Sequence, residues 1–153
     1  MKSKVTRLAA LATTIVLAAS LAFAAPKALK TSAKDVPPFP GTLLNARFVY
    51  VASYDGDLFN PNLLPEDRQA IVTVQNAMQK WGKFTLVYEP RLADVVILVT
   101  SRPSEDILAV YDAHDLPDGQ YLWRMMGRSG LQPSETPLIT NLEKAFEQAA
   151  AAK

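Results

Sequence analysis

The sequence predicts an α/β (α+β) fold: a mixed sheet of about five strands, with two helices packed on one face. Two segments repeat apolar residues at the three- and four-residue spacing of an amphipathic helix. Five short segments are rich in β-branched or aromatic residues, and glycine, proline or aspartate separates them. The expected order is strand, helix, four strands, helix. Because the apolar stripes of the helices must be buried, they are expected to cover the sheet.

The first predicted strand and the first predicted helix have clear boundaries. Residues 47–54 are rich in β-branched and aromatic residues and run into the turn sequence Asp55-Gly56-Asp57. The helix is expected to begin at Pro65, because proline suits a first helical position and two acidic residues follow it. Gly82 is expected to end the helix in a left-handed conformation. The apolar face of this helix consists of Ile71, Val74, Met78 and Trp81.

Four further strands and a second helix complete the predicted domain. Residues 95–99 form an uninterrupted apolar run, so that strand is expected to be central and covered on both faces. The sequence Leu116-Pro117-Asp118-Gly119 is typical of a type I turn and predicts a hairpin between the last two strands. Thr136-Pro137 is expected to start the second helix. The four strands are expected at residues 84–88, 95–99, 107–111 and 121–126.

The first 24 residues have the pattern of a cleavable signal peptide. Three basic residues precede an uncharged segment, residues 8–25, which ends in small residues suited to a signal peptidase. Cleavage is expected after Ala24, with the position after Ala25 as the second choice. The alternative is an uncleaved anchor, because about 18 apolar residues just span a bilayer. The protein is therefore expected to be exported to the periplasm or the cell exterior, with no membrane span after cleavage.

Residues 25–42 are predicted to be a linker or tail, and residues 43–150 a single domain. The linker is rich in proline and lysine and has no periodicity. Removal of the signal peptide takes three of the 16 basic residues and leaves 13 against 15 acidic ones, a net charge of −2. This balance predicts that the protein does not bind nucleic acid. The chain has no cysteine, which excludes disulfides, thiolate metal sites and a thiol nucleophile.

A group of polar residues in two loops is one candidate site. Asp55 and Asp57 follow the first strand, and Asp112, His114 and Asp115 follow the fourth. A histidine flanked by carboxylates is able to act as a base or a metal ligand if the two loops converge. The simpler interpretation is that these aspartates form turns. Because no ligand spacing typical of zinc or calcium is present, no metal and no cofactor are predicted.

A second candidate is a protein-binding patch formed by Trp123, Arg124, Met126 and Arg128. Tryptophan, methionine and arginine are enriched at protein interfaces. In a strand, Trp123 and Met125 share one face while Arg124 and Met126 share the other, so one of the two sets must belong to the core. Core packing alone also explains large apolar residues here.

Three segments resemble a family of small bacterial envelope domains. They are Gln79–Phe84 running into a strand, Leu92-Ala93-Asp94-Val95-Val96-Ile97, and Asp112 followed by Gly119 and Leu122-Trp123. The family includes accessory lipoprotein domains that activate cell-wall synthases and the curli secretion lipoprotein. The resemblance covers residues 46–150 and implies an α/β envelope domain that works by contact. The chain lacks the lipobox cysteine, so a lipid anchor does not carry over, and no functional residues are transferred.

The leading hypothesis is an exported, non-enzymatic domain that acts by protein–protein contact, with another envelope protein as its partner. The signal peptide, the lack of a catalytic motif and the family resemblance all favour it. The alternative is a small periplasmic hydrolase or metal-dependent enzyme that uses the loop with Asp112, His114 and Asp115. Convergence of these side chains in a cleft would favour the enzyme.

Overall fold

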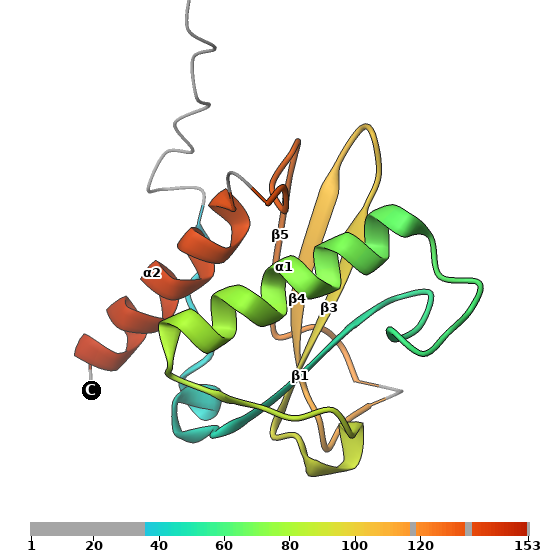
Figure 1. Ribbon diagram of the computed structural model, residues 1–153. Coiled ribbons are helices and arrows are strands. Elements are labelled where there is room, and N and C mark those ends of the chain that lie inside the picture. The colour runs from blue at the N-terminus through green and yellow to red at the C-terminus, as the bar shows by residue number, and fades with distance from the viewer. Residues whose placement is uncertain (1–35, 117–118, 134–135, 153) are drawn as a thin grey trace, which may run out of the picture. The chain divides into compact units, whose positions relative to one another are not determined.

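A computed structural model of the protein describes residues 36–116, 119–133 and 136–152. It has the fold class that the sequence predicts, a mixed five-stranded sheet with two helices on one face (Figure 1). The predicted signal peptide (residues 1–24), residues 25–35 of the predicted linker, and Pro117-Asp118 of the predicted turn lie outside the described residues.

The strands lie in the order β2-β1-β3-β4-β5. Strand β1 runs parallel to β2 and β3, whereas β4 is antiparallel to both β3 and β5. Helix α1 connects β1 to β2, and α2 follows β5. The bounds are Phe48–Ser53 for β1, Pro65–Trp81 for α1, Thr85–Leu86 for β2, Val95–Ser101 for β3, Asp106–Asp112 for β4, Trp123–Gly127 for β5 and Pro137–Ala151 for α2; short 3-10 helices span Gly41–Asn45 and Pro90–Leu92.

The helix boundaries agree with the sequence prediction, whereas the strands differ from it by one or two residues at their ends. Helix α1 begins at Pro65 and ends before Gly82, which has a left-handed φ of 71°. Strand β2 contains two residues where five were expected, because it pairs with β1 only at Thr85 and Leu86. Strand β5 starts at Trp123, two residues later than expected.

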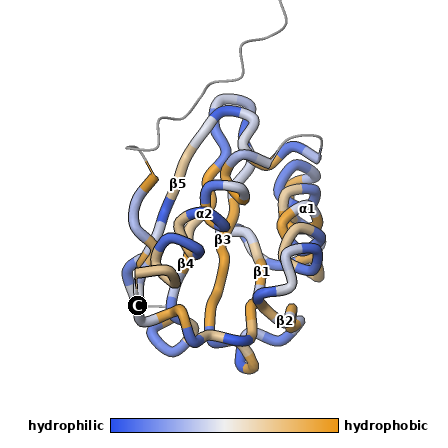
Figure 2. Tube along the Cα trace, turned by 90° about the vertical axis from the view of Figure 1, so that its left-hand side faces the viewer, coloured by the Kyte–Doolittle hydropathy of each residue, from blue (hydrophilic) through white to orange (hydrophobic). Residues whose placement is uncertain are grey.

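Strand β3 is the centre of the sheet, as its apolar run predicts. It pairs with β1 on one side and β4 on the other, and its apolar run is orange in Figure 2. Val95, Ile97 and Val99 face the helices, and Val96 is buried on the opposite side. Full burial of each such side chain contributes about 1.5–3 kcal/mol.

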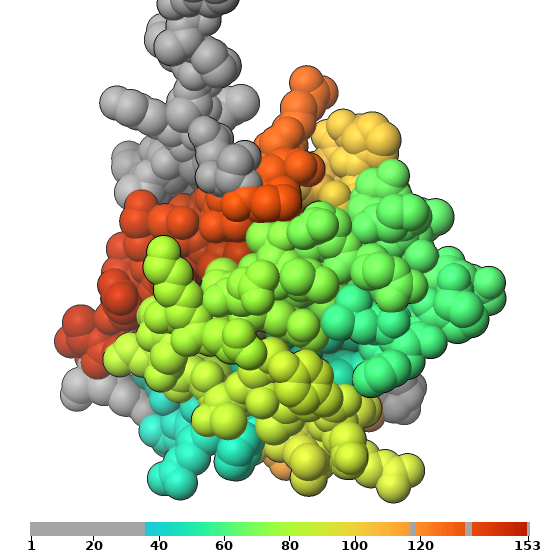
Figure 3. Space-filling model, viewed as in Figure 1, coloured from blue at the N-terminus to red at the C-terminus, as the bar shows by residue number. Residues whose placement is uncertain are grey.

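Both helices pack on the same face and share one hydrophobic core with the strands beneath them. Figure 3 shows this face closed by α1 in green and α2 in red. The ring of Phe146 on α2 makes edge contacts with three other rings, at centroid distances of 5.2–5.6 Å. These rings belong to Phe39, Trp81 and Phe84, so the aromatic cluster joins α2 to α1 and to the chain before β1.

The folded part begins earlier than residue 43, the predicted start of the domain. Phe39 is buried against Phe146, and the carbonyl oxygen of Pro37 accepts a hydrogen bond of 2.7 Å from Nε1 of Trp123. The prediction of a linker over residues 25–42 is therefore wrong for residues 36–42. The prediction follows the high proline content of this segment and gives no weight to Phe39, which lies in the core.

Candidate functional site

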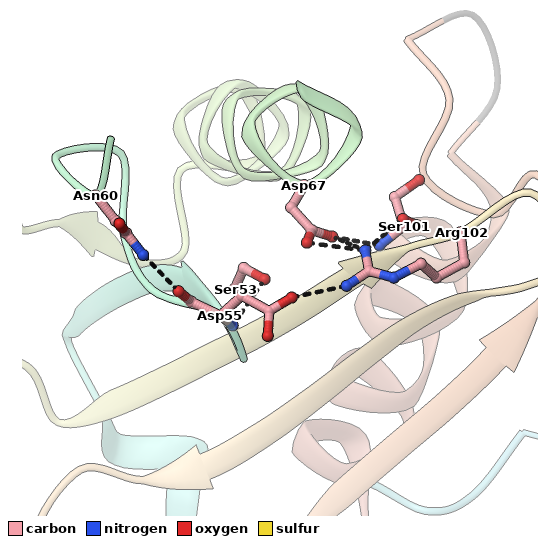
Figure 4. Close-up of polar contacts among 6 residues, drawn as sticks. All are labelled: Ser53, Asp55, Asn60, Asp67, Ser101 and Arg102. Atoms are coloured by element: carbon pink, nitrogen blue, oxygen red, sulfur yellow. Dashed lines mark hydrogen bonds and ion pairs between the residues drawn. The ribbon is translucent and has the colours of Figure 1, made fainter. Parts of the chain in front are cut away.

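A partly buried ion-pair cluster joins the first turn of α1 to the end of β3 (Figure 4). Asp67 has no exposed surface, and one of its oxygens accepts a 2.7 Å hydrogen bond from the backbone N–H of Ser101. The guanidinium of Arg102 donates to both oxygens of Asp67 at 2.8 Å and reaches Asp55 at 2.7 Å. Hydrogen bonds from Arg102 to Asp67, and then to Asp55, raise the pKa of the guanidinium above its ordinary value. The cluster is therefore held by charge-assisted hydrogen bonds.

Neighbouring polar groups extend the cluster into the adjacent loops. Asp106 is buried and accepts hydrogen bonds from Oγ of Ser101 at 2.7 Å and from the backbone N–H of Leu131 at 2.9 Å. The side-chain amide of Asn60 donates to the backbone oxygen of Asp55 at 2.7 Å. Throughout the described chain, every buried side-chain nitrogen and oxygen has a hydrogen-bond partner. The cluster thus fixes loops, and it leaves no buried polar group free for a ligand.

At the opposite end of the sheet, Asp94 and Asp112 border an open depression of about 370 Å³. Asp94 accepts hydrogen bonds from the backbone N–H groups of Arg47 and Phe48 at 2.8 and 3.0 Å, and these bonds lower its pKa. Asp112 accepts a 2.9 Å bond from the backbone N–H of His114 and lies 3.0 Å from Nδ1 of that residue. These two interactions, the backbone bond first, lower the pKa of Asp112. Both carboxylates are therefore ionised local acceptors.

The structure does not bring the polar-loop residues into one site. Asp55 and Asp57 follow β1, whose last residue pairs with Val99, whereas Asp112 lies opposite Val95. Four residues of strand separate these two positions, about 13 Å. His114 is exposed, as is Asp115. No three His, Cys, Asp or Glu side chains of the described ranges are grouped closely enough to hold a metal ion.

The second face of the sheet carries no helix of the described chain (Figure 1). Strand register places its side chains in rows across the strands. One row contains Ala52, Leu98, Ala109 and Arg124, and the row beside it contains Thr100, Ile107 and Met126. Ala52 and Ala109 are buried despite the missing helix layer.

Two tyrosines account for the burial of these alanines. Tyr54 and Tyr111 lie on either side of the alanine row, and their hydroxyls share a hydrogen bond of 2.9 Å. Their rings meet edge to face with centroids 6.5 Å apart. The two side chains therefore span the row and replace part of a helix layer.

The hydroxyls of Tyr50 and Tyr54 stay protonated at neutral pH. Burial raises the pKa of Tyr50 to about 12, and the charge of Asp57, whose carboxylate accepts the Tyr50 hydroxyl at 3.1 Å, adds to this effect. Burial and the hydrogen bond with Tyr111 raise the pKa of Tyr54, while the positive charge of Arg124 acts in the opposite direction. At neutral pH these groups are neutral hydrogen-bonding groups rather than phenolate bases.

We define the helix-free patch as Tyr54, Tyr121, Arg124 and Met126. The guanidinium carbon of Arg124 lies 5.6 Å from the centre of the Tyr121 ring, and both residues are close enough to Tyr54 to influence its pKa. Met126 is on the same face as Arg124, one alternation further along β5. Tyr54, Tyr121 and Met126 are 46%, 51% and 44% exposed.

The sequence-predicted patch needs one correction and one addition. Trp123 is only 1% exposed on the helix-covered side, so it does not belong to the patch. Arg124 and Met126 lie on the helix-free face, and Arg128 is exposed just beyond β5. The sequence prediction does not include Tyr54, and it places Tyr121 on the face of Trp123 because the strand is expected to begin at residue 121. Strand β5 begins only at Trp123, and the Tyr121 ring lies against Arg124. Alternation along the first strand was the available signal for Tyr54, because Val49 and Val51 face the helices.

Comparisons of the chain with protein-family models, with curated proteins and with solved structures found no match in any of the three. The resemblance to bacterial envelope domains therefore stays a prediction. Within the described ranges, no helix has the length and apolar character needed to cross a membrane.

Proposed function

We propose that the protein is an exported, non-enzymatic domain that acts in the bacterial envelope by binding another protein. The observation that carries this proposal is the helix-free patch, where three large side chains, each about half exposed, lie on the same side of the sheet as a partly buried arginine. Tyrosine, methionine and arginine are enriched at interfaces, and tyrosine and arginine also dominate binding hot spots.

The state of the polar side chains favours binding over catalysis. The carboxylates of the alternative enzyme site lie at opposite ends of the sheet, and several are engaged in local hydrogen bonds. A hydrolase needs a base and a nucleophile within hydrogen-bond reach of each other. His114, the single histidine of the chain, instead contacts Asp112 in an exposed loop.

The location in the envelope is supported by the signal-peptide pattern of residues 1–24 and by the family resemblance over residues 46–150. The observed α+β class agrees with the class that the resemblance implies. An envelope partner follows from this location, because an exported domain meets other exported proteins.

Photo-crosslinking in the cells that naturally produce the protein tests the proposal. A photoreactive amino acid replaces Met126 in the full-length chain, and the matched control replaces Val72, an exposed residue of α1 on the other side of the sheet. The Met126 position should give one discrete adduct in the exported fraction, and the Val72 position should not. Equal adducts from both positions, or none from Met126, would contradict the proposal.

A further inference from the structure

Arg124 and Arg102 differ in their ion pairs. Arg102 makes ion pairs with two aspartates. Arg124 is also partly buried, but it forms no ion pair with any residue of the described ranges. Its one recorded side-chain interaction is with the ring of Tyr121. A guanidinium held over an aromatic ring keeps its N–H donors in the plane of the group, available to a planar acceptor.

We infer that the helix-free patch binds a carboxylate carried by the partner protein, an Asp or Glu side chain flanked by apolar residues. This inference rests on the proposed function and names the partner chemistry of the same site. A carboxylate complements the fork of donors on a guanidinium and accepts two parallel hydrogen bonds. Tyr54, Tyr121 and Met126 supply the surrounding apolar surface, which excludes water and strengthens the charge-assisted contact.

The charge that would bind a carboxylate lies at the helix-free patch rather than over the whole surface. The described residues contain 12 Asp and Glu against nine Lys and Arg, so the surface as a whole does not attract acidic ligands. The patch itself carries positive charge, because Arg124 is part of it and Arg128 follows just beyond the end of β5. A phosphate polymer needs several basic contacts in a row, which this surface does not offer. A single carboxylate placed among apolar groups fits it better.

Three synthetic peptides test the inference against the processed protein obtained from full-length expression. The peptides have the sequence acetyl-Thr-Val-Leu-Xaa-Leu-Val-Thr-amide, with Glu, Gln or Lys as Xaa, and binding is followed by NMR at the methyl group of Met126 and at Nε–H of Arg124. The Glu peptide should bind at least about fivefold more tightly than the Gln peptide, because only the carboxylate makes charge-assisted bonds. The Lys peptide should bind more weakly than both.

Variants separate the role of the guanidinium from general effects. Arg124→Gln should abolish the preference for Glu over Gln, and Arg124→Lys should keep part of it, since lysine retains the charge without the fork. Lys144→Gln on α2 removes the same charge from an exposed position on the helical side and should leave the preference unchanged. The amide spectrum of each variant establishes that it is folded.

Equal binding of the Glu and Gln peptides, no binding of either, or signal changes remote from the patch would overturn the inference. Crosslinking at Met126 reports separately on the proposed function. A discrete Met126 adduct together with no preference for the Glu peptide would support protein binding at the patch. It would contradict the inference that the partner supplies a carboxylate. Preference for Glu that survives Arg124→Gln would also overturn the inference.

Discussion

The buried carboxylate of Asp67 is expected to contribute to the stability of the fold through its hydrogen bonds. Its two oxygens accept hydrogen bonds from Ser101 and Arg102 with no exposed surface of their own. In Asp67→Ala, a buried backbone N–H and part of a guanidinium lose their acceptors. Arg102 keeps its ion pair with Asp55 and its contact with water, so its charge is not left without a partner. We therefore expect the free energy of unfolding, measured by urea denaturation, to fall by about 2–3 kcal/mol.

Glu66→Ala is the matched control for this change. Glu66 is exposed in the same first turn of α1, so its charge interacts with the helix dipole and has no recorded hydrogen-bond partner among the described residues. Its removal should cost about 0.3–1 kcal/mol. Equal losses in the two variants would show that the helix terminus, rather than the ion pair with Arg102, determines the stability.

The polar residues also mark the limit of prediction from sequence at this scale. The acids after Pro65 were correctly interpreted as first-turn residues of a helix. The burial of Asp67 was not predicted, because its partner Arg102 lies 35 residues away and the contact depends on how β3 is placed against α1. The same reason explains why the sequence does not separate the loops with Asp55 and Asp112, since the distance between them depends on the strand directions.

Gly82 determines where α1 ends. Its φ of 71° is left-handed, and its backbone N–H bonds to the carbonyl oxygen of Met78. A β-carbon at this position would meet no atom within 4 Å, so the cost of Gly82→Ala is conformational. We expect the free energy of unfolding to fall by about 1 kcal/mol in urea denaturation.

Gly41→Ala provides the comparison. A β-carbon at Gly41 also has open space around it, but the residue does not have a left-handed φ. The substitution should therefore change stability by less than about 0.5 kcal/mol. A loss at Gly41 as large as that at Gly82 would mean that left-handed geometry is not the cause.

Whole elements were easier to predict than the site they form. Periodicity and end residues located α1 and α2, and the apolar run at residues 95–99 identified the central strand. The candidate patch is predicted only in part, since Arg124 and Met126 are on β5 whereas Tyr54 follows β1, two strands further across the sheet than β4. The order of the strands brings these residues together, and a single sequence does not contain that order in its local pattern.

At the scale of the molecule, the two faces of the sheet are covered in different ways. Two helices and the segment before β1 close one face with a large apolar core. On the other face, tyrosine side chains and the loops beside them bury a smaller cluster and leave the helix-free patch at its border. A face covered by amphipathic side chains combines a dry interior with hydrogen-bonding groups at the surface. This difference is why we propose the interaction site on the helix-free side.

The segment before β1 is the least expected part of the helical face, and Phe39 tests its role. Phe39 is 4% exposed in the cluster with Phe146, whereas Phe59, in the loop before α1, is 81% exposed. Phe39→Ala should lower the free energy of unfolding by about 3–4 kcal/mol, because it leaves a cavity in the core. Phe59→Ala should lower it by less than about 0.5 kcal/mol. Both are measured by urea denaturation.

Phe39→Leu keeps the test informative if the alanine variant does not fold. It retains most of the apolar volume and should cost about 1–1.5 kcal/mol. The expected order of stability is wild type and Phe59→Ala together, then Phe39→Leu, then Phe39→Ala. If all three variants unfold at the urea concentration of the wild type, the chain before residue 43 contributes nothing to the core, and the fold begins where the sequence pattern placed it.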